Sequence, residues 1–220
     1  MTALRYPTVL FDLDGTLVDS YAALAEAVNF ARREHGLHDL EPDCVRSFVG
    51  DGVETLLQRA FGSSEVPPSA QQAFESHYGD ICCARSLVLD DVESTLEALA
   101  GFGTVMAVCT NKPTSFSRQI LDALGLARHF RAIVGPDLAG ARKPDGRHVL
   151  RTLQEAGCEG RDALFVGDMP IDVQAARNSG IKVAVVPTGS STRTELAASK
   201  PDHLLDGFAD LVGLVSGGVR

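Results

Sequence analysis

Positive charge is scarce in this chain, which limits the partners it can have. The net charge is −9, and no lysine precedes Lys112. An acidic chain is a poor match for the phosphate backbone of nucleic acids or for an anionic membrane surface. We therefore expect neither as a main partner. A small phosphorylated metabolite, held in a pocket with its own local charge, stays compatible with this composition.

Long apolar runs and paired cysteines are also absent. No run reaches the roughly 18 apolar residues that cross a bilayer, and the first six residues lack the apolar stretch of a signal peptide. The five cysteines are odd in number and form no C-x-x-C pair, which is typical of a reducing compartment. The sequence predicts a cytoplasmic protein, whose 220 residues can bury a core without disulfides or structural metals.

The chain does contain an alternation of short apolar runs and helical patterns. The runs are rich in Val, Ile, Leu and Phe, as parallel strands buried on both faces are. They lie at residues 6–11, 104–109, 132–135, 163–167 and 182–186. Apolar residues at helical spacing occur at residues 91–100, 113–124, 148–156 and 171–178. The alternation predicts an α/β fold with a doubly wound parallel sheet, whose ligands bind at the carboxyl ends of the strands.

One segment interrupts the alternation, from about residue 21 to residue 87. Its pattern is helical only, and glycine and proline residues divide it. We expect helices at residues 22–34, 44–60 and 70–82. The sequence therefore predicts a catalytic core made of residues 1–17 and 88–220, and a small all-helical cap, residues 18–87, inserted after the first strand. The insert is either a lid over the strand ends or a passive helical subdomain.

The strongest chemical signal is a pair of carboxylates at the end of the first apolar run. Asp12 and Asp14 are two residues apart, so a strand places both side chains on the same side, and Gly15 allows a sharp turn after them. Two close carboxylates repel each other unless they share a cation or a proton. A solvated acidic turn would look similar, but the apolar run before the pair and Gly15-Thr16 after it favour a functional site.

Polar residues also follow three later strands of the predicted sheet. Thr110 and Asn111 offer a hydroxyl, an amide and N–H groups to an anion, and Lys143 supplies a cation close to a helix start, where anions are favoured. Asp168 and Asp172 supply further carboxylates. Each group alone could be a turn residue, a surface charge or a helix cap. Their shared placement at strand ends predicts one common site.

Taken in order, these motifs resemble those of the haloacid dehalogenase superfamily, in particular its phosphatases with a helical cap after the first strand. The motifs are Asp12-x-Asp14-Gly-Thr, Thr110-Asn111, Lys143-Pro144, and Gly167-Asp168 with Asp172. The resemblance spans nearly the whole chain and implies a Rossmann-like core. The cap segment Val-Gly-Asp-Gly-Val-Glu-Thr-Leu-Leu, which begins at Val49, and the segment Thr-Asn-Lys-Pro at residues 110–113 are similar to the phosphoglycolate phosphatase group.

The resemblance implies a hydrolase of small phosphomonoesters that works through an aspartyl phosphate. Asp12 would attack phosphorus, and Asp14 would give a proton to the leaving alcohol and then help a water molecule attack the intermediate. Thr110 and Lys143 would also take part in catalysis, because positioning and charge stabilisation dominate phosphoryl transfer. Phosphoglycolate is the first substrate to expect on this resemblance.

The same resemblance implies a magnesium site and a phosphate site. Mg²⁺ would bind Asp12, the main-chain carbonyl of Asp14, and Asp168, which are hard oxygen ligands with no His or Cys among them. Asp172 would support the metal ligands without binding the metal itself. The phosphoryl oxygens would be held by Thr110, Asn111 and Lys143.

Two positions depart from the family pattern. Relatives often have proline two residues after Lys-Pro, where this chain has Gly146. The loop Met169-Pro170-Ile171 is also more apolar than is common there. Neither change removes a predicted catalytic group, but both bear on loop geometry and on contacts with the substrate.

Alternatives within and outside the superfamily differ in identifiable residues. Dehalogenases lack the second aspartate that Asp14 provides, and phosphonate-cleaving relatives need a cap lysine, which this chain lacks. Sugar phosphomutases keep both aspartates but carry a cap arginine after the glycine that matches Gly50, where Asp51 and Gly52 stand here; this alternative stays open. A phospho-acceptor signalling module also clusters Asp, Thr and Lys, but it is shorter, has no inserted lid, and carries the phosphorylated aspartate on a later strand.

Overall fold

A parallel six-stranded sheet forms the centre of the computed structural model, which describes residues 4–160 and 162–218. Its strand order is β5-β4-β1-β6-β7-β8, with every pairing parallel. The strands are β1 (Thr8–Phe11), β4 (Val105–Cys109), β5 (Ala132–Val134), β6 (Ala163–Gly167), β7 (Lys182–Val185) and β8 (His203–Leu204). The five predicted apolar runs all form strands, and the α/β sheet is confirmed. The two-residue β8 is too short to show an apolar pattern.

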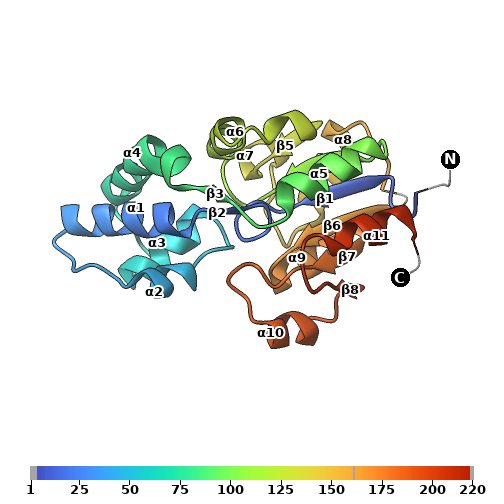
Figure 1. The fold of residues 1–220 in the computed structure, drawn as a ribbon. Helices are drawn as coiled ribbons and strands as arrows, with labels where there is room; N and C mark the ends of the chain where they lie inside the picture. Colours follow the sequence, from blue (N-terminus) through green and yellow to red (C-terminus); the bar gives the residue numbers. More distant parts are fainter. Residues whose placement is uncertain (1–3, 161, 219–220) are drawn as a thin grey trace.

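Helices cover both faces of this sheet (Figure 1). Side chains alternate along β1, so Val9 and Phe11 face one apolar cluster while Leu10 faces the other. The first cluster includes residues of α5 (Val92–Gly101), α6 (Thr114–Ala123) and α11 (Asp210–Ser216). The second includes residues of α8 (Gly146–Glu155), α9 (Pro170–Ser179) and α10 (Arg193–Ala198). The connections also contain the short helix α7 (Pro136–Ala139) and the 3-10 helix η1 (Ala127–His129).

The inserted helices lie beyond the carboxyl ends of the strands, to the left in Figure 1. They are α1 (Tyr21–Glu34), α2 (Pro42–Arg46), α3 (Val53–Phe61) and α4 (Pro68–Arg85). Where the chain leaves and re-enters the core, β2 (Val18–Asp19) and β3 (Leu87–Val88) pair antiparallel, Asp19 opposite Leu87. No helix in residues 4–160 and 162–218 has the length and apolar character needed to cross a membrane.

The prediction of one helix over residues 44–60 is wrong, because a loop separates α2 from α3. Within it, Gly50 has φ +126° and Gly52 has φ +93°, values that no right-handed helix adopts. A Cβ on Gly50 would clash with Sδ of Met169, so the loop packs closely against the core. The sequence indicated a single helix because Val49, which is buried in the loop, continues the helical spacing of apolar residues.

Truncation of a central core residue should measure how much stability this packing contributes. Leu10 is fully buried in β1, so we expect Leu10→Ala to lower the free energy of unfolding by about 2–5 kcal/mol, through lost burial and the cavity left behind. Leu150→Ala, whose side chain is 49% exposed on α8, should stay within about 0.5 kcal/mol of the wild type. Urea denaturation of both variants makes the comparison, and equal effects would contradict the assignment of the core.

Candidate active site

The two aspartates of the first motif lie where β1 ends at the sheet edge that faces the inserted helices. Asp12 is buried, and its N–H donates to Val166 O on β6. The carboxylate of Asp14 accepts from Ser20 Oγ at 2.5 Å. Gly15 follows with φ +83°, and a Cβ there would lie 2.5 Å from Tyr21 Oη and 2.6 Å from Asp168 Oδ2. Only glycine therefore fits the turn that brings β1 to this edge.

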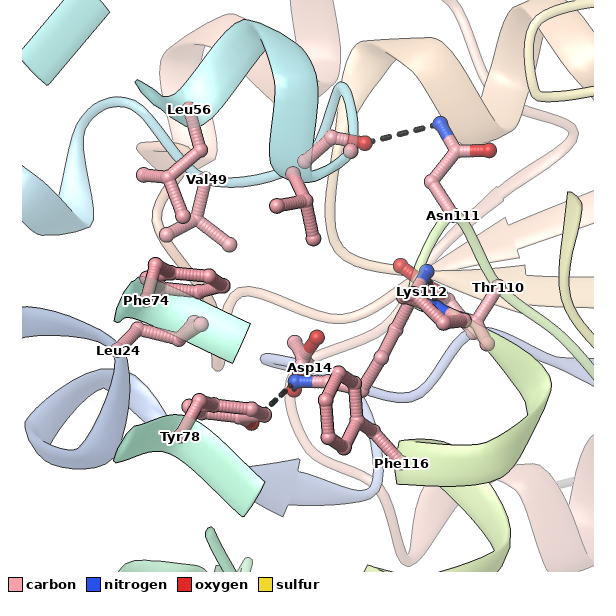
Figure 2. A pocket seen from close by; sticks show the side chains of 15 residues that line it. Asp14, Leu24, Val49, Leu56, Phe74, Tyr78, Thr110, Asn111, Lys112 and Phe116 are labelled. Carbon is pink, nitrogen blue, oxygen red and sulfur yellow. Dashed lines mark hydrogen bonds and ion pairs between the residues drawn. The ribbon is translucent and has the colours of Figure 1, made fainter. Parts of the chain in front are cut away.

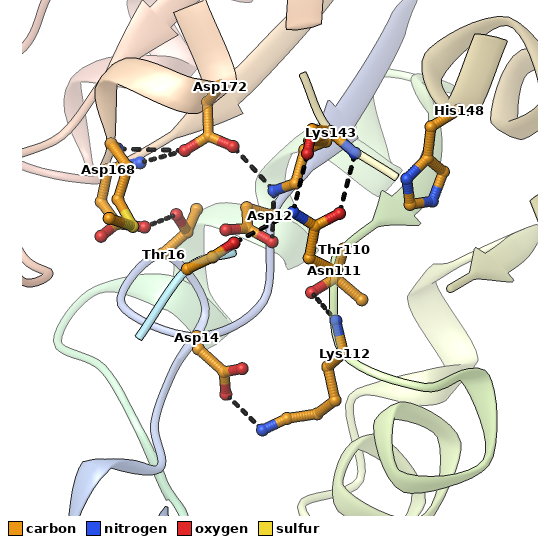
Figure 3. Close-up of polar contacts among 12 residues, drawn as sticks. Asp12, Asp14, Thr16, Thr110, Asn111, Lys112, Lys143, His148, Asp168 and Asp172 are labelled. Carbon is orange, nitrogen blue, oxygen red and sulfur yellow. Dashed lines mark hydrogen bonds and ion pairs between the residues drawn. The ribbon is translucent and has the colours of Figure 1, made fainter. Parts of the chain in front are cut away.

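A buried lysine joins two of the predicted acidic residues. Lys143 Nζ lies 2.8 Å from Asp12 Oδ1 and 2.7 Å from Asp172 Oδ1 (Figure 3). Burial alone would lower the pKa of Lys143, but the two carboxylates outweigh it and raise that pKa above its usual value. The lysine is therefore charged at neutral pH and holds the carboxylate of Asp12 at the carboxyl end of β1.

The carboxylates of Asp12, Asp168 and Asp172 gather in one buried cluster. One oxygen from each lies within 4.8 Å of the others. Asp172 Oδ2 accepts from the N–H groups of Asp168 and Met169, so this residue caps α9 as well. Asp168 Oδ1 accepts from Thr16 Oγ1 at 2.8 Å, whereas its buried Oδ2 has no partner among the described residues.

This cluster carries more negative charge than its surroundings compensate. Burial raises the pKa of Asp168 well above its usual value, and Asp172 and Asp12 add to the effect. Burial likewise raises the pKa of Asp172 to about 6, although Lys143 opposes the shift. A buried carboxylate oxygen without a donor, among all-oxygen neighbours, fits a hard divalent cation. The residues present therefore fit the predicted metal.

Thr110 and Asn111 lie at the end of β4, next to Lys143. Thr110 Oγ1 accepts from the N–H of Lys112. The Asn111 amide binds the main chain of Lys143 on both sides: Oδ1 accepts from its N–H at 2.8 Å, and Nδ2 donates to its carbonyl at 3.1 Å. Nδ2 also donates to the Gly50 carbonyl in the α2–α3 loop. The amide thus orients the lysine loop and joins it to the inserted helices; its predicted contact with phosphoryl oxygens stays a prediction.

Asp14 has a partner to which the motifs assigned no role. Lys112 Nζ donates to Asp14 Oδ1 at 2.8 Å and to Tyr78 Oη at 2.7 Å. Lys112 comes from the loop between β4 and α6, and Tyr78 from α4. Burial alone would lower the pKa of Lys112, but Asp14 and Tyr78 outweigh it and raise that pKa. The sequence does single out Lys112, as the first lysine in the chain, but Tyr78 carries no comparable signal.

A cavity lies between the sheet edge and the inserted helices (Figure 2). Both Asp12 and Asp14 line it. Thr110, Asn111 and Lys112 form its core side. Its other side is mainly apolar and is formed by Leu24, Val49, Val53, Leu56 and Phe74 of the inserted segment, with Tyr78. Phe116 of α6 adds an aromatic ring from the core. A small molecule in this cavity would meet carboxylates and the cation of Lys112 at one end and hydrocarbon at the other.

A family model described as haloacid dehalogenase-like hydrolase matches residues 9–186. The chain belongs to this family. Its similarity to the phosphoglycolate phosphatase of Agrobacterium fabrum is 36% identity over 211 residues, covering 93% of this chain and 90% of that protein. The phosphoglycolate phosphatase of Caulobacter vibrioides is 37% identical over 214 residues, covering 94% of this chain and 90% of its own.

A solved structure supports the same assignment. The crystal structure of a predicted phosphoglycolate phosphatase from Haemophilus somnus superimposes with a TM-score of 0.88 at 31% identity, covering 96% of this chain and 98% of that one. The resemblance seen in the motifs is confirmed, and the chain is a phosphatase of the haloacid dehalogenase-like family.

The buried His148 gives a measurable pH dependence of stability. Its Nε2–H donates to Val134 O, and burial, followed by the nearby Lys143, lowers its pKa to about 4. Unfolded histidine has a pKa of about 6.5, so between these values the unfolded chain binds the extra proton and stability falls as the pH falls. Between pH 7 and pH 4, the free energy of unfolding of the wild type should therefore fall by about 3 kcal/mol more than that of His148→Gln, since one pKa unit corresponds to about 1.4 kcal/mol.

Urea denaturation at a series of pH values measures this difference. The exposed His38, replaced in His38→Gln, provides the control and should follow the wild type. Parallel pH profiles for wild type and His148→Gln would show that the buried imidazole does not titrate in this way.

Proposed function

We propose that this phosphatase hydrolyses phosphoglycolate through a phosphorylated Asp12, with Mg²⁺ as its cofactor. The observation that carries the proposal is the placement of Asp12, which lines the cavity and whose carboxylate is paired with the buried Lys143. The names of the relatives at 36% and 37% identity support the substrate. Phosphoglycolate is small, and the cavity is confined by the inserted helices.

The two aspartates divide the chemistry between them. An oxygen of Asp12 attacks phosphorus, and the bond from phosphorus to the ester oxygen breaks. Asp14 gives its proton to the departing glycolate oxygen, then accepts a proton from the water molecule that attacks the aspartyl phosphate and frees inorganic phosphate. Asp14 suits this role because it lines the same cavity two residues beyond the nucleophile.

Lys143, Thr110 and Asn111 would hold the transferred group. The charge of Lys143 lies 2.8 Å from the attacking carboxylate, where it would also stabilise the phosphoryl oxygens in the transition state. Thr110 lines the cavity beside Asp12 and offers its hydroxyl. Asn111 would act through its main chain and through its hold on Lys143, since its amide is bonded to the lysine loop.

Asp12, Asp168 and the main-chain carbonyl of Asp14 would hold the metal ion. When bound there, Mg²⁺ would neutralise charge on the phosphoryl group. Asp172 would orient the set through its bonds to Lys143 and to the N–H of Asp168.

A mutase shares these residues, so product analysis separates the two activities: a phosphatase releases inorganic phosphate, whereas a mutase returns the phosphoryl group to a sugar.

Phosphate release from a panel of phosphomonoesters, with and without Mg²⁺, tests the nucleophile and the substrate together. We expect phosphoglycolate to be hydrolysed fastest, and Asp12→Asn to remove turnover while the protein stays folded, because the amide keeps the volume but cannot attack. Release of phosphate by folded Asp12→Asn at a tenth of the wild-type rate would refute the assignment. Turnover of a sugar phosphate without phosphate release would favour the mutase.

Metal binding can be measured without activity. We expect saturating Mg²⁺ to raise the melting temperature of the wild type, because a ligand at 100 times its dissociation constant stabilises a protein by about 2.7 kcal/mol. Asp168→Asn should lose this shift, and without metal it should be at least as stable as the wild type, because a buried repelling charge is gone. Asp206→Asn, at the surface, is the control. An undiminished shift in Asp168→Asn would place the metal elsewhere.

A further inference from the structure

Two of the four lysines of the chain are buried, and they contact different aspartates. Lys143 and Lys112 are 2% and 7% exposed, whereas Lys182 and Lys200 lie at the surface. Lys143 contacts Asp12, so its charge belongs to the nucleophile and the phosphoryl group. Lys112 contacts Asp14 instead, and the proposed function assigns it no role. A buried charge is costly unless something compensates it.

The position of Lys112 is on the leaving-group side of the reaction. Asp14, as general acid, has to face the ester oxygen that departs, and Lys112 Nζ lies 2.8 Å from its carboxylate. Beyond this point the cavity wall formed by the inserted helices is mainly apolar. Among the described residues that line the cavity, Lys112 is the only cation, so a charged leaving group would find its counter-charge there (Figure 2).

The Tyr78 hydroxyl is held rigidly beside this ammonium group. Its ring is stacked on Phe74, with centroids 5.5 Å apart and planes at 7°, and meets Phe116 edge-on at 5.1 Å. Burial raises the pKa of Tyr78 to about 12, so the hydroxyl keeps its proton at neutral pH. Its oxygen accepts from Lys112, and the O–H proton can be donated to another oxygen.

The two groups together offer two donors to one ligand. An ammonium group has three N–H donors, and Asp14 and Tyr78 take two of those of Lys112. The third N–H and the O–H of Tyr78 come from neighbouring atoms 2.7 Å apart. Two donors this close match the two oxygens of a carboxylate, and the positive charge strengthens the bonds.

We propose that Lys112 and Tyr78 bind a carboxylate on the leaving alcohol, and that this pair selects phosphate esters whose alcohol carries that charge. The inference rests on the proposed function and adds the feature by which the substrate class is recognised. Lys112 comes from the core and Tyr78 from the inserted helix α4, so the carboxylate would be bound between the two parts of the molecule.

A pair of esters that differ only at the far end of the alcohol tests the proposal. Phosphoglycolate carries a carboxylate, and 2-hydroxyethyl phosphate of the same length carries a neutral hydroxymethyl group. The wild type should show a higher kcat/KM for phosphoglycolate. In Lys112→Met we expect the ratio of the two kcat/KM values to fall about 10- to 100-fold, the range for a lost charge-assisted hydrogen bond, mainly through the KM of phosphoglycolate.

Two further variants keep the test decisive. Tyr78→Phe retains the stacked ring, and the ratio should fall by a smaller factor, since a neutral donor is lost. Lys182→Met removes a surface lysine, 63% exposed and paired with Asp202, and should leave the ratio unchanged. If Lys112→Met instead lowers kcat equally for both esters, Lys112 only positions Asp14 and the proposal is overturned.

Binding to Asp12→Asn separates this inference from the proposed function. By calorimetry, Asp12→Asn should bind phosphoglycolate more tightly than 2-hydroxyethyl phosphate, and adding Lys112→Met should remove the difference. Equal binding of both esters overturns the carboxylate site, even where Asp12-dependent hydrolysis stands. A preference that depends on Lys112 supports the site, even where turnover of phosphoglycolate fails and with it the proposed reaction.

Discussion

The ion pairs of Lys143 with Asp12 and Asp172 are the constraint on which the rest of the site depends. All three side chains are buried, and they come from the end of β1, a loop before α8, and the first turn of α9. Removing one member would leave an unpaired buried charge, which costs about 3–5 kcal/mol. The strand end, the loop and the helix therefore have to stay together. The Asn111 amide also fixes the loop, because it bonds both the N–H and the carbonyl of Lys143.

The cluster holds three carboxylates, those of Asp12, Asp168 and Asp172, and the one ammonium group of Lys143, so its charges do not balance. Asp168 brings a third carboxylate whose Oδ2 has no partner among the described residues. Burial raises the pKa values of Asp168 and Asp172, and repulsion from the neighbouring carboxylates adds to the effect. A protein that kept such a cluster for stability alone would gain by replacing one acid with a neutral residue. The arrangement is understandable when a cation is part of the working state, as proposed for Mg²⁺.

The sheet and the acidic residues could be predicted because both follow from local rules. Buried parallel strands are apolar throughout, and polar residues directly after them gather at one edge; Asp12 and Asp168 were predicted in this way. Lys143 lies beyond α7, and its signal was a cation close to a helix start. The α2–α3 loop was not predicted, because Val49 continues a helical spacing while Gly50 and Gly52 adopt positive φ. Tyr78 was not predicted either, because its place beside Lys112 depends on how α4 packs against the core, which the spacing of apolar residues does not specify.

The pairing of β2 with β3 has a consequence for how enzymes of this design can diversify. Because Asp19 lies opposite Leu87, the two ends of the inserted segment lie side by side where they join the core. Insertions and replacements are tolerated where the affected backbone meets the rest of the fold at few points. The helices between these strands can therefore change in length and composition over generations without shifting the register of the sheet. The part of the cavity wall that these helices form can then be altered while Asp12 and Lys143 of the core are inherited unchanged.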